Sequence, residues 1–288
     1  MKDVVNSNAA VPGASTVHAL LHGNAERASL PRLERTMLLS YASGMTRVAL
    51  MTHPERLLPG DVVRAFDALC RRRAAGEPMA YIVGEREFFG LNLGTSPAVL
   101  IPRPETELLV EAALAVIPEQ GPVRLLDLGT GSGAIAIALA RHRPMATIVA
   151  TDVSREALAQ AKANALANGA NDVDFIVSDW FGALRGPRFD VIVSNPPYIP
   201  AGDPHLETGD LRFEPKLALR SGADGLDAIH AISGTAMRWL LPGGWLMLEH
   251  GYDQGSRCRD LLERAGFVRA ETRRDLAGLE RVTFGQAP

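Results

Sequence analysis

Apolar residues recur three and four positions apart along the first part of the chain, which is the spacing of amphipathic helices. The pattern runs from about Thr16 to Ala75 and is interrupted at glycine, proline and asparagine, where helices end. It is carried by the runs TVHALLHGNAERA, SLPRLERTMLLSYAS and PGDVVRAFDALCRRRAAG. We therefore predict a small helical domain over residues 16–76, preceded by a flexible tail over residues 1–15.

The pattern changes between residues 77 and 98, where short runs alternate apolar and polar positions. Runs around residues 81–83 and 88–93 predict a β-hairpin that links two domains. Pro102 and Pro104 then stiffen the chain ahead of a helix that we expect to begin near Glu105.

Strands and helices alternate beyond Gly121. Runs such as VRLLDLG and FDVIVSN are almost wholly apolar, as expected of strands inside a parallel sheet, and helical runs such as AIAIALARHR lie between strands. A further helix has Ser154 to cap its start and Gly169 to end it. FVRAETRRD and LERVTFGQ predict a closing hairpin. This order predicts a doubly wound α/β domain over residues 99–288, with ligands outside the carboxyl ends of its strands.

Composition narrows the class of protein. The chain has 288 residues, 47% of them hydrophobic, and its net charge of −3 gives no basic footprint for broad nucleic-acid binding. No apolar run is long enough to cross a bilayer, the first residues lack the core of a secretory signal, and the two cysteines have no metal or redox spacing. His18 and His22 have the spacing of a zinc pair, but no third ligand is evident. We expect a monomeric cytoplasmic protein with neither a metal nor a membrane partner.

The first predicted strand ends in a glycine-rich turn, DLGTGSGA, that contains Gly129, Gly131 and Gly133. Such a turn lets a ligand approach the backbone closely and presents N–H groups at the start of a helix. The spacing also fits the dinucleotide fingerprint G-x-G-x-x-A, and Asp152, after the second strand, suits the ribose hydroxyls of either cofactor. These features alone leave a nicotinamide cofactor and S-adenosylmethionine equally open.

The third predicted strand ends at Asp179 and Trp180. The carboxylate can accept a hydrogen bond from an exocyclic amine, and the indole can pack beside a purine ring. The pair therefore predicts an adenine site.

The fourth predicted strand ends in the tetrapeptide Asn195-Pro196-Pro197-Tyr198, through which no sheet ladder can continue. A planar amide or amine nitrogen is a weak nucleophile because its lone pair is delocalised, and two acceptors aimed at its N–H groups would hold it in plane. The Asn195 side-chain oxygen and the Pro196 carbonyl can be those acceptors, since Pro197 keeps residue 196 extended. Tyr198 offers a flat wall. The tetrapeptide predicts methylation of a planar nitrogen, whereas a dehydrogenase would leave it without a role.

The motifs LDLGTGSGAIAIALA, TDVSREAL, SDWFGAL, VSNPPYIP and LEHGYDQG, in this order, resemble those of bacterial release factor glutamine methyltransferases of the HemK/PrmC type. The likeness extends to GEREFFGLNL, LIPRPETELLVE, RFEPKLAL and RDLAGLERVTFG. It implies a Rossmann-like class I methyltransferase domain and an N-terminal helical domain that recognises the substrate. The implied reaction transfers a methyl group from S-adenosyl-L-methionine to the side-chain amide nitrogen of the glutamine in the Gly-Gly-Gln motif of class I peptide chain release factors, which modulates translation termination.

The resemblance also implies roles for individual residues. Cofactor contacts are expected at Gly129, Thr130, Gly131, Ser132, Gly133, Asp152, Asp179, Trp180 and Asn195. The substrate glutamine is expected at Asn195, Pro196, Pro197 and Tyr198, of which Asn195, Pro196 and Tyr198 are the catalytic candidates. Phe88 and Arg103 lie in matching upstream motifs and are expected to border the methionine end of the cofactor or the substrate.

An alternative substrate follows from the same tetrapeptide, which also occurs in enzymes that methylate the N6 amine of adenine in DNA or RNA. Such an enzyme must bind a polyanion and reach a base. The only evident basic tract is Arg71-Arg72-Arg73, within a predicted helix. We therefore favour a protein substrate without direct contact to nucleic acid.

Overall fold

The computed structural model describes residues 13–23 and 29–288, and the chain divides into two compact units, Met1–Val83 and Gly84–Pro288. Most of the expected N-terminal tail and residues 24–28 of the first predicted helical run lie outside the described residues. Ser15, at the end of the expected tail, instead pairs with Leu58 in a two-stranded ribbon.

The first unit is helical, as its apolar spacing predicts. Its elements are β1 (Ser15–Thr16), α1 (Val17–His22), α3 (Arg32–Ser43), α4 (Arg47–Thr52), β2 (Leu57–Leu58), α5 (Gly60–Ala74) and α6 (Met79–Val83). Thr16 and Thr46 cap α1 and α4 by accepting hydrogen bonds from backbone N–H groups, and Gly44 ends α3 at a φ of 67°. Buried side chains such as Leu38 and Phe66 form its core. The prediction of a strand over residues 81–83 is wrong, because these residues belong to α6, whose Tyr81 and Ile82 are buried.

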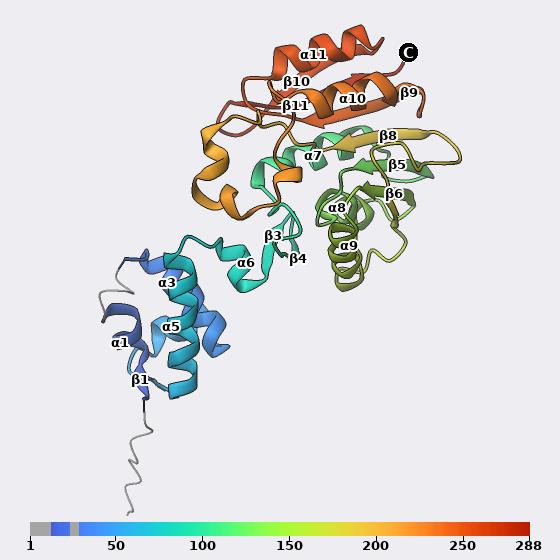
Figure 1. Cartoon of the computed structure of the whole chain (residues 1–288). Helices are drawn as coiled ribbons and strands as arrows, with labels where there is room; N and C mark the ends of the chain where they lie inside the picture. Colours follow the sequence, from blue (N-terminus) through green and yellow to red (C-terminus); the bar gives the residue numbers. More distant parts are fainter. Residues whose placement is uncertain (1–12, 24–28) are drawn as a thin grey trace, which may run out of the picture. The chain divides into compact units, whose positions relative to one another are not determined.

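The second unit is built on a seven-stranded sheet in the order β10-β11-β9-β8-β5-β6-β7 (Figure 1). Its strands are β5 (Val123–Leu128), β6 (Ala146–Asp152), β7 (Asp174–Val177), β8 (Phe189–Ser194), β9 (Leu240–Glu249), β10 (Val268–Arg274) and β11 (Glu280–Gln286). The strands from β9 to β7 are parallel, and β10 and β11 form an antiparallel hairpin at one edge. The predicted doubly wound α/β sheet and the closing hairpin are confirmed.

Helices cover both faces of this sheet, so β5 and β8 are buried on both sides. One apolar cluster joins the sheet to α7 (Glu107–Val116) and α8 (Ala134–His142), next to which α9 (Arg155–Ala167) packs. The other joins it to α10 (Asp227–Ala236) and α11 (Gly255–Arg264). Ser154 caps α9 as predicted, whereas Asn168 is the C-cap and Gly169 follows it at a φ of 67°.

Several short elements connect the strands and helices of this unit. A hairpin of β3 (Glu85–Phe88) and β4 (Leu91–Gly94) turns through Phe89 and Gly90, and the 3₁₀ helix η1 (Pro104–Thr106) leads into α7. Three more 3₁₀ helices, η2 (Pro204–Glu207), η3 (Gly209–Phe213) and η4 (Lys216–Ala218), lie between β8 and α10. Within the described ranges, no helix is both long and apolar enough to cross a bilayer.

Candidate active site

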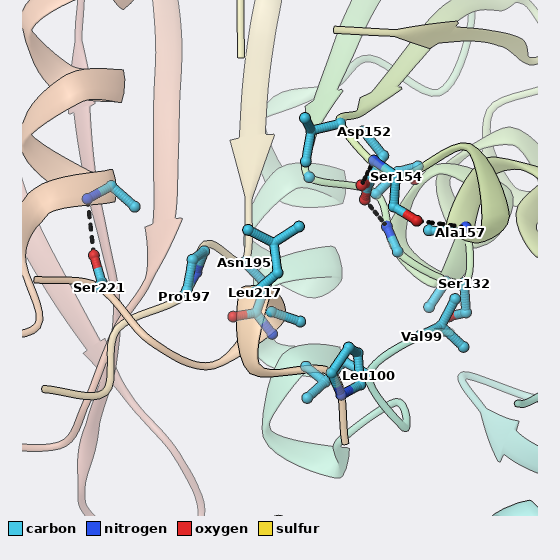
Figure 2. A pocket seen from close by; sticks show the side chains of 18 of the residues that line it. Val99, Leu100, Ser132, Asp152, Ser154, Ala157, Asn195, Pro197, Leu217 and Ser221 are labelled. Atoms are coloured by element: carbon cyan, nitrogen blue, oxygen red, sulfur yellow. Dashed lines mark hydrogen bonds between the residues drawn. The ribbon is translucent and has the colours of Figure 1, made fainter. Parts of the chain in front are cut away.

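A cavity of about 600 Å³ lies at the carboxyl ends of β5, β6, β7 and β8, where the fold predicts a ligand (Figure 2). The sequence-predicted residues that line it are Gly129, Thr130, Gly131, Ser132, Asp152, Asp179, Trp180, Asn195, Pro197 and Arg103. Gly133, Pro196, Tyr198 and Phe88 are not among its lining residues. The structure thus gathers most of the predicted site from strand ends that are far apart in the sequence.

The glycine turn after β5 needs its glycines for different reasons. Gly129, Gly131 and Gly133 have φ values of 70°, 55° and 84°, which side-chain-bearing residues rarely adopt. A Cβ on Gly129 would lie 3.4 Å from the Trp180 ring, so this glycine lets the indole come close. A Cβ on Gly133 would lie 2.9 Å from Ile137 Cδ1, so Gly133 serves the packing of α8 and α9 behind the cavity.

Asp152 holds the turn and faces the cavity. Its Oδ2 accepts from the Gly131 N–H at 2.9 Å, and its Oδ1 accepts from the Ser154 N–H at 2.9 Å (Figure 2). Each carboxylate oxygen can accept a further hydrogen bond, so Asp152 can also receive ligand hydroxyls.

Trp180 stands beside the turn in a strained backbone conformation, with a φ of 43°. The Ser178 hydroxyl donates to the Trp180 carbonyl at 2.8 Å and accepts from the Ala183 N–H at 3.0 Å, which holds this conformation. The exposed side chain of Asp179 lies at the same cavity wall. A carboxylate and an indole are therefore available together, as the adenine-site prediction requires.

Asp127 is a buried carboxyl beneath the turn that the sequence analysis missed. The Thr130 hydroxyl donates to its Oδ2 at 2.6 Å, and burial raises the pKa of Asp127 to about 7. Its signal in the sequence is an aspartate that follows two leucines inside a mostly apolar strand, just before the glycine turn.

Asn195 reaches the cavity from the end of β8 (Figure 2). Its Nδ2 donates to the Thr106 hydroxyl oxygen at 3.0 Å. The contact uses one of the two donor positions of the amide and fixes which way the amide points, so its Oδ1 remains an acceptor. Thr106 also lines the cavity and was not singled out from the sequence.

Tyr198 differs from its expected place as a flat wall of the cavity. Its ring packs against the second apolar cluster of the sheet, and its hydroxyl donates to Glu249 Oε1 at 3.3 Å. Burial is the largest of the causes that raise the Tyr198 pKa above its ordinary value, so the phenol stays protonated at neutral pH. Pro197, whose ring is part of the lining, occupies the position at the cavity instead.

Glu249, at the end of β9, is a second buried carboxyl, only 1% exposed. Burial raises the pKa of Glu249 to about 7, although the Tyr198 hydroxyl donates to its Oε1. Among the described residues, its Oε2 has no hydrogen-bond partner. The motif LEHGYDQG contains this glutamate, yet nothing in the motif indicates that it is buried and accepts from Tyr198.

Arg103 lines the cavity and pairs with Glu214, whose side chain is fully buried. Glu214 Oε2 also accepts from the Ile101 N–H at 3.1 Å. Phe88, the other upstream residue, is 1% exposed and packs with Leu93 and Leu109 in the first apolar cluster. It therefore supports the hairpin from inside and does not border the cavity.

The residues present fit S-adenosylmethionine in size and chemistry. The cavity volume matches that of small-molecule sites. The carboxylates of Asp152 and Asp179 can accept hydrogen bonds from ribose hydroxyls and an adenine amine, and the Trp180 indole provides an aromatic face. Beyond Asn195, the cavity is bordered by apolar side chains of Leu100, Pro215 and Leu217. Over residues 13–23 and 29–288, no three His, Cys, Asp or Glu side chains gather as metal ligands would.

Known protein families match most of the chain. The Methyltransferase small domain family matches residues 105–210, and the PrmC N-terminal domain family matches residues 24–84. Among solved structures, the 16S rRNA N2 G1207 methyltransferase of Thermus thermophilus, in complex with AdoMet and guanosine, has a TM-score of 0.53 and 25% identity over 71% of this chain and 50% of that one. A methyltransferase from Pyrococcus furiosus shares the fold, with a TM-score of 0.52 and 18% identity over 69% of this chain and 89% of that one.

Curated relatives match at higher identity. The chain is 50% identical over 270 residues to the release factor glutamine methyltransferase of Xylella fastidiosa, and this match covers 94% of this chain and 98% of that protein. It is 52% identical to the protein of the same name from Pseudomonas aeruginosa, over 88% and 92% of the two chains, and 47% identical to that of Burkholderia pseudomallei, over 98% and 99%. The family expected from the motifs is confirmed, and the chain belongs to the release factor glutamine methyltransferases.

Proposed function

We propose that this protein transfers the methyl group of S-adenosyl-L-methionine to the side-chain amide nitrogen of the glutamine in the Gly-Gly-Gln motif of class I peptide chain release factors. The observation that carries the proposal is the hydrogen bond from Asn195 Nδ2 to Thr106, which leaves the Asn195 oxygen as an acceptor in the cavity. A hydrogen-bond acceptor at this point suits a substrate that receives the methyl group on a nitrogen carrying N–H groups.

The donor half of the proposed site consists of the glycine turn, Asp152, Asp179 and Trp180. S-adenosylmethionine, when bound, supplies a methyl group on a positively charged sulfur. Asp152 would receive its ribose hydroxyls, and Asp179 and Trp180 would hold its adenine between a carboxylate and an aromatic face.

The acceptor half would hold the glutamine amide by its two N–H groups. Asn195 Oδ1 would accept from one of them at the cavity, and the carbonyl of the next residue, Pro196, is proposed as the second acceptor although Pro196 does not line the cavity itself. A methylated, protonated amide is strongly acidic, so its proton leaves to water and no general base is required. Orientation then supplies most of the acceleration, which reaches about 7–11 kcal/mol in favourable cases.

The helical N-terminal unit would recognise the release factor. Leu33, Met37 and Tyr41 lie four residues apart on α3, so they share one face of this helix, and all three are exposed. An exposed apolar stripe of this kind fits a protein partner better than a polyanion. A substrate that works on the ribosome also implies a cytoplasmic enzyme, and the protein is expected to act as a monomer.

The proposal is tested by incubating the purified protein and labelled S-adenosylmethionine with a purified class I release factor. Mass spectrometry should find one added methyl group on the glutamine that follows two glycines. A release factor in which this glutamine is alanine should stay unlabelled. Label in DNA or RNA with an untouched release factor would contradict the proposal and favour adenine methylation.

A further inference from the structure

Gln254 connects the end of the tetrapeptide at residues 195–198 to another part of the fold. Its Nε2 donates to the Tyr198 carbonyl at 3.0 Å, and its Oε1 accepts from the Gly251 N–H at 2.8 Å. The residue is 3% exposed, lies in the turn between β9 and α11, and does not line the cavity. One partner needs a donor and the other an acceptor, so the amide has a single orientation. It links the tetrapeptide to a turn that lies 56 residues later in the chain.

The two prolines make the tetrapeptide depend on contacts at its ends. Neither Pro196 nor Pro197 has an N–H group to donate, and proline fixes φ without fixing ψ. In the part of the chain that the structure describes, neither proline carbonyl accepts a hydrogen bond. At one end the Asn195 side chain is bonded to Thr106. The direction of the Pro196 carbonyl is therefore set by this end and by Tyr198 at the other.

Tyr198 is held at two points. Its hydroxyl donates to Glu249 Oε1 at 3.3 Å, and its carbonyl accepts from Gln254. Gly225, in the loop before α10, makes room for the second bond. It has a φ of 81°, and a Cβ there would lie 2.3 Å from the Tyr198 carbonyl oxygen and 2.7 Å from Gln254 Nε2. The packing around this carbonyl thus leaves no space for a side chain at position 225.

We propose that Gln254 is a positioning residue of the methyl transfer. By holding the Tyr198 carbonyl, it fixes the backbone that leads back to Pro196, whose carbonyl is assigned to the substrate amide. Without this donor the peptide after Tyr198 would be free to turn, and the acceptor pair would lose its aim. The inference rests on the proposed function, because that function gives the tetrapeptide its substrate. The role needs no contact between Gln254 and the reacting atoms.

The first test is Gln254→Leu, which removes both the donor and the acceptor at similar volume. We expect kcat to fall about 10–100-fold, with KM for the release factor and Kd for S-adenosylhomocysteine within about 3-fold of the wild type. Binding of S-adenosylhomocysteine also reports that the variant is folded. Wild-type kcat in Gln254→Leu overturns the proposal, and so does a fall in kcat that only matches a loss of affinity for S-adenosylhomocysteine.

Gln254→Glu provides a readout that a packing role would not change. A protonated carboxyl copies both bonds, since its hydroxyl can donate to the Tyr198 carbonyl while its other oxygen accepts from Gly251. An ionised carboxylate can only accept, so it would face the Tyr198 carbonyl with a second acceptor. The ratio of variant to wild-type kcat should be within about 3-fold of one at low pH and fall about 10–100-fold as the pH rises. A ratio that stays constant from about pH 5.5 to pH 9 overturns the proposal.

The elements around this turn carry other charged groups, and these are the same in both proteins. They are Glu249 and His250 at the end of β9, Asp253 in the turn, Arg257 on α11, Asp224 before α10, and Glu280 and Arg281 on β11. Their own titration affects the wild type and Gln254→Glu alike, so the ratio of the two kcat values reports the introduced carboxyl. The ratio of the two Kd values for S-adenosylhomocysteine should stay constant over the same pH range.

Gly225→Ala disturbs the same carbonyl from the opposite side. Its methyl group would collide with the Tyr198 carbonyl and Gln254 Nε2, so kcat should fall about 10–100-fold. Gly278→Ala, in the turn between β10 and β11, is the matched control, because its φ is 79° and nothing lies within 4 Å of its Cβ. It carries the same backbone strain and should keep kcat within about 3-fold of the wild type. Equal kcat values in Gly225→Ala and Gly278→Ala would overturn the inference.

The two proposals can fail separately. A wild-type protein that leaves the release factor unmethylated contradicts the proposed function. A wild-type protein that methylates it, with variants of Gln254 and Gly225 that behave as the wild type does, contradicts only the positioning role.

Discussion

Arg103 and Glu214 form an ion pair between two segments that are 111 residues apart in the chain, at one wall of the cavity. The Glu214 side chain is fully buried, whereas the arginine is 29% exposed. Burial raises the pKa of Glu214, and the charge of Arg103 is the largest influence that opposes the rise. The pair fastens the segment before η1 to the segment before η4.

Removal of the arginine should destabilise the second unit. Arg103→Ala leaves a buried carboxylate without its charge partner, which should lower the free energy of unfolding by about 1–3 kcal/mol. Thermal denaturation measures the loss, and Arg86→Ala, at an exposed position of β3, is a matched control. The double variant Arg103→Ala, Glu214→Gln should recover much of the lost stability. A loss in the double variant equal to the sum of the losses in the two single variants would argue against the pair.

Gly131→Ala and Gly133→Ala should differ in their effects, one mainly on cofactor binding and the other also on stability. Gly131→Ala adds a methyl group with nothing within 4 Å, so beyond backbone strain of about 1–2 kcal/mol its effect should fall on the cavity and on S-adenosylhomocysteine affinity. Gly133→Ala carries the same strain and also collides with Ile137 and Ala161, so it should lower the melting temperature more. Calorimetry and thermal denaturation of both variants provide the comparison. Equal melting temperatures of Gly131→Ala and Gly133→Ala would contradict this prediction.

Asn195→Ala should nearly abolish methyl transfer while S-adenosylhomocysteine still binds. The variant removes one of the two acceptors proposed for the substrate amide, and loss of a preorganised polar contact of this kind costs about 100–1,000-fold in kcat. Steady-state kinetics and calorimetry measure the two quantities. Asn171→Ala, at an exposed loop position, serves as the control, and wild-type turnover in Asn195→Ala would refute the acceptor role.

Leu217 should affect the protein substrate more than the cofactor. It lines the cavity beyond Asn195 although it is 64% exposed, so it is placed to contact a chain that enters from outside (Figure 2). Leu217→Ser should raise KM for the release factor by about 5–30-fold, as expected for one lost apolar contact of about 1–2 kcal/mol, without a change in stability. Leu276→Ser, in the exposed turn between β10 and β11, is the control. An unchanged KM in Leu217→Ser would place the entering chain elsewhere.

The buried carboxyls Asp127 and Glu249 predict how stability depends on pH. The pKa of each is raised to about 7 in the folded protein, above the ordinary values for Asp and Glu in an unfolded chain. The folded state therefore binds more protons than the unfolded state between about pH 4 and pH 7, and the stability that these groups contribute falls as the pH rises through this window. Denaturation at pH 5 and pH 8 measures the slope. The fall in the free energy of unfolding from pH 5 to pH 8 should be smaller in Asp127→Asn than in the wild type. An unchanged fall would show that other groups cause the pH dependence.

The positions of the residues proposed to hold the donor were predictable from the sequence, because these residues directly follow their strands. Once β5 and β6 are recognised as neighbours in a parallel sheet, the glycine turn and Asp152 must meet at one edge. The same argument applies to Asn195 at the end of β8. Periodicity and turn chemistry were sufficient for these positions.

The support of the acceptor end was not predictable in this way. Thr106 lies directly before a helix and Asn195 directly after a distant strand, and their hydrogen bond depends on how α7 packs on the sheet. The direction of the Tyr198 ring and the burial of Phe88 depend in the same way on tertiary packing. The run over residues 81–83 was too short to separate helix from strand by period.

The order of the sheet has a consequence for how such enzymes diversify. β5 lies between β6 and β8, so the residues assigned to the donor come from one side and those assigned to the acceptor nitrogen from the other. Along the chain the donor segment, residues 129–180, is complete before the acceptor segment begins at Asn195. Because Thr106 comes before this segment and its partner Asn195 after it, a change of the acceptor nitrogen requires matched changes at two distant points of the chain while the segment between them stays the same.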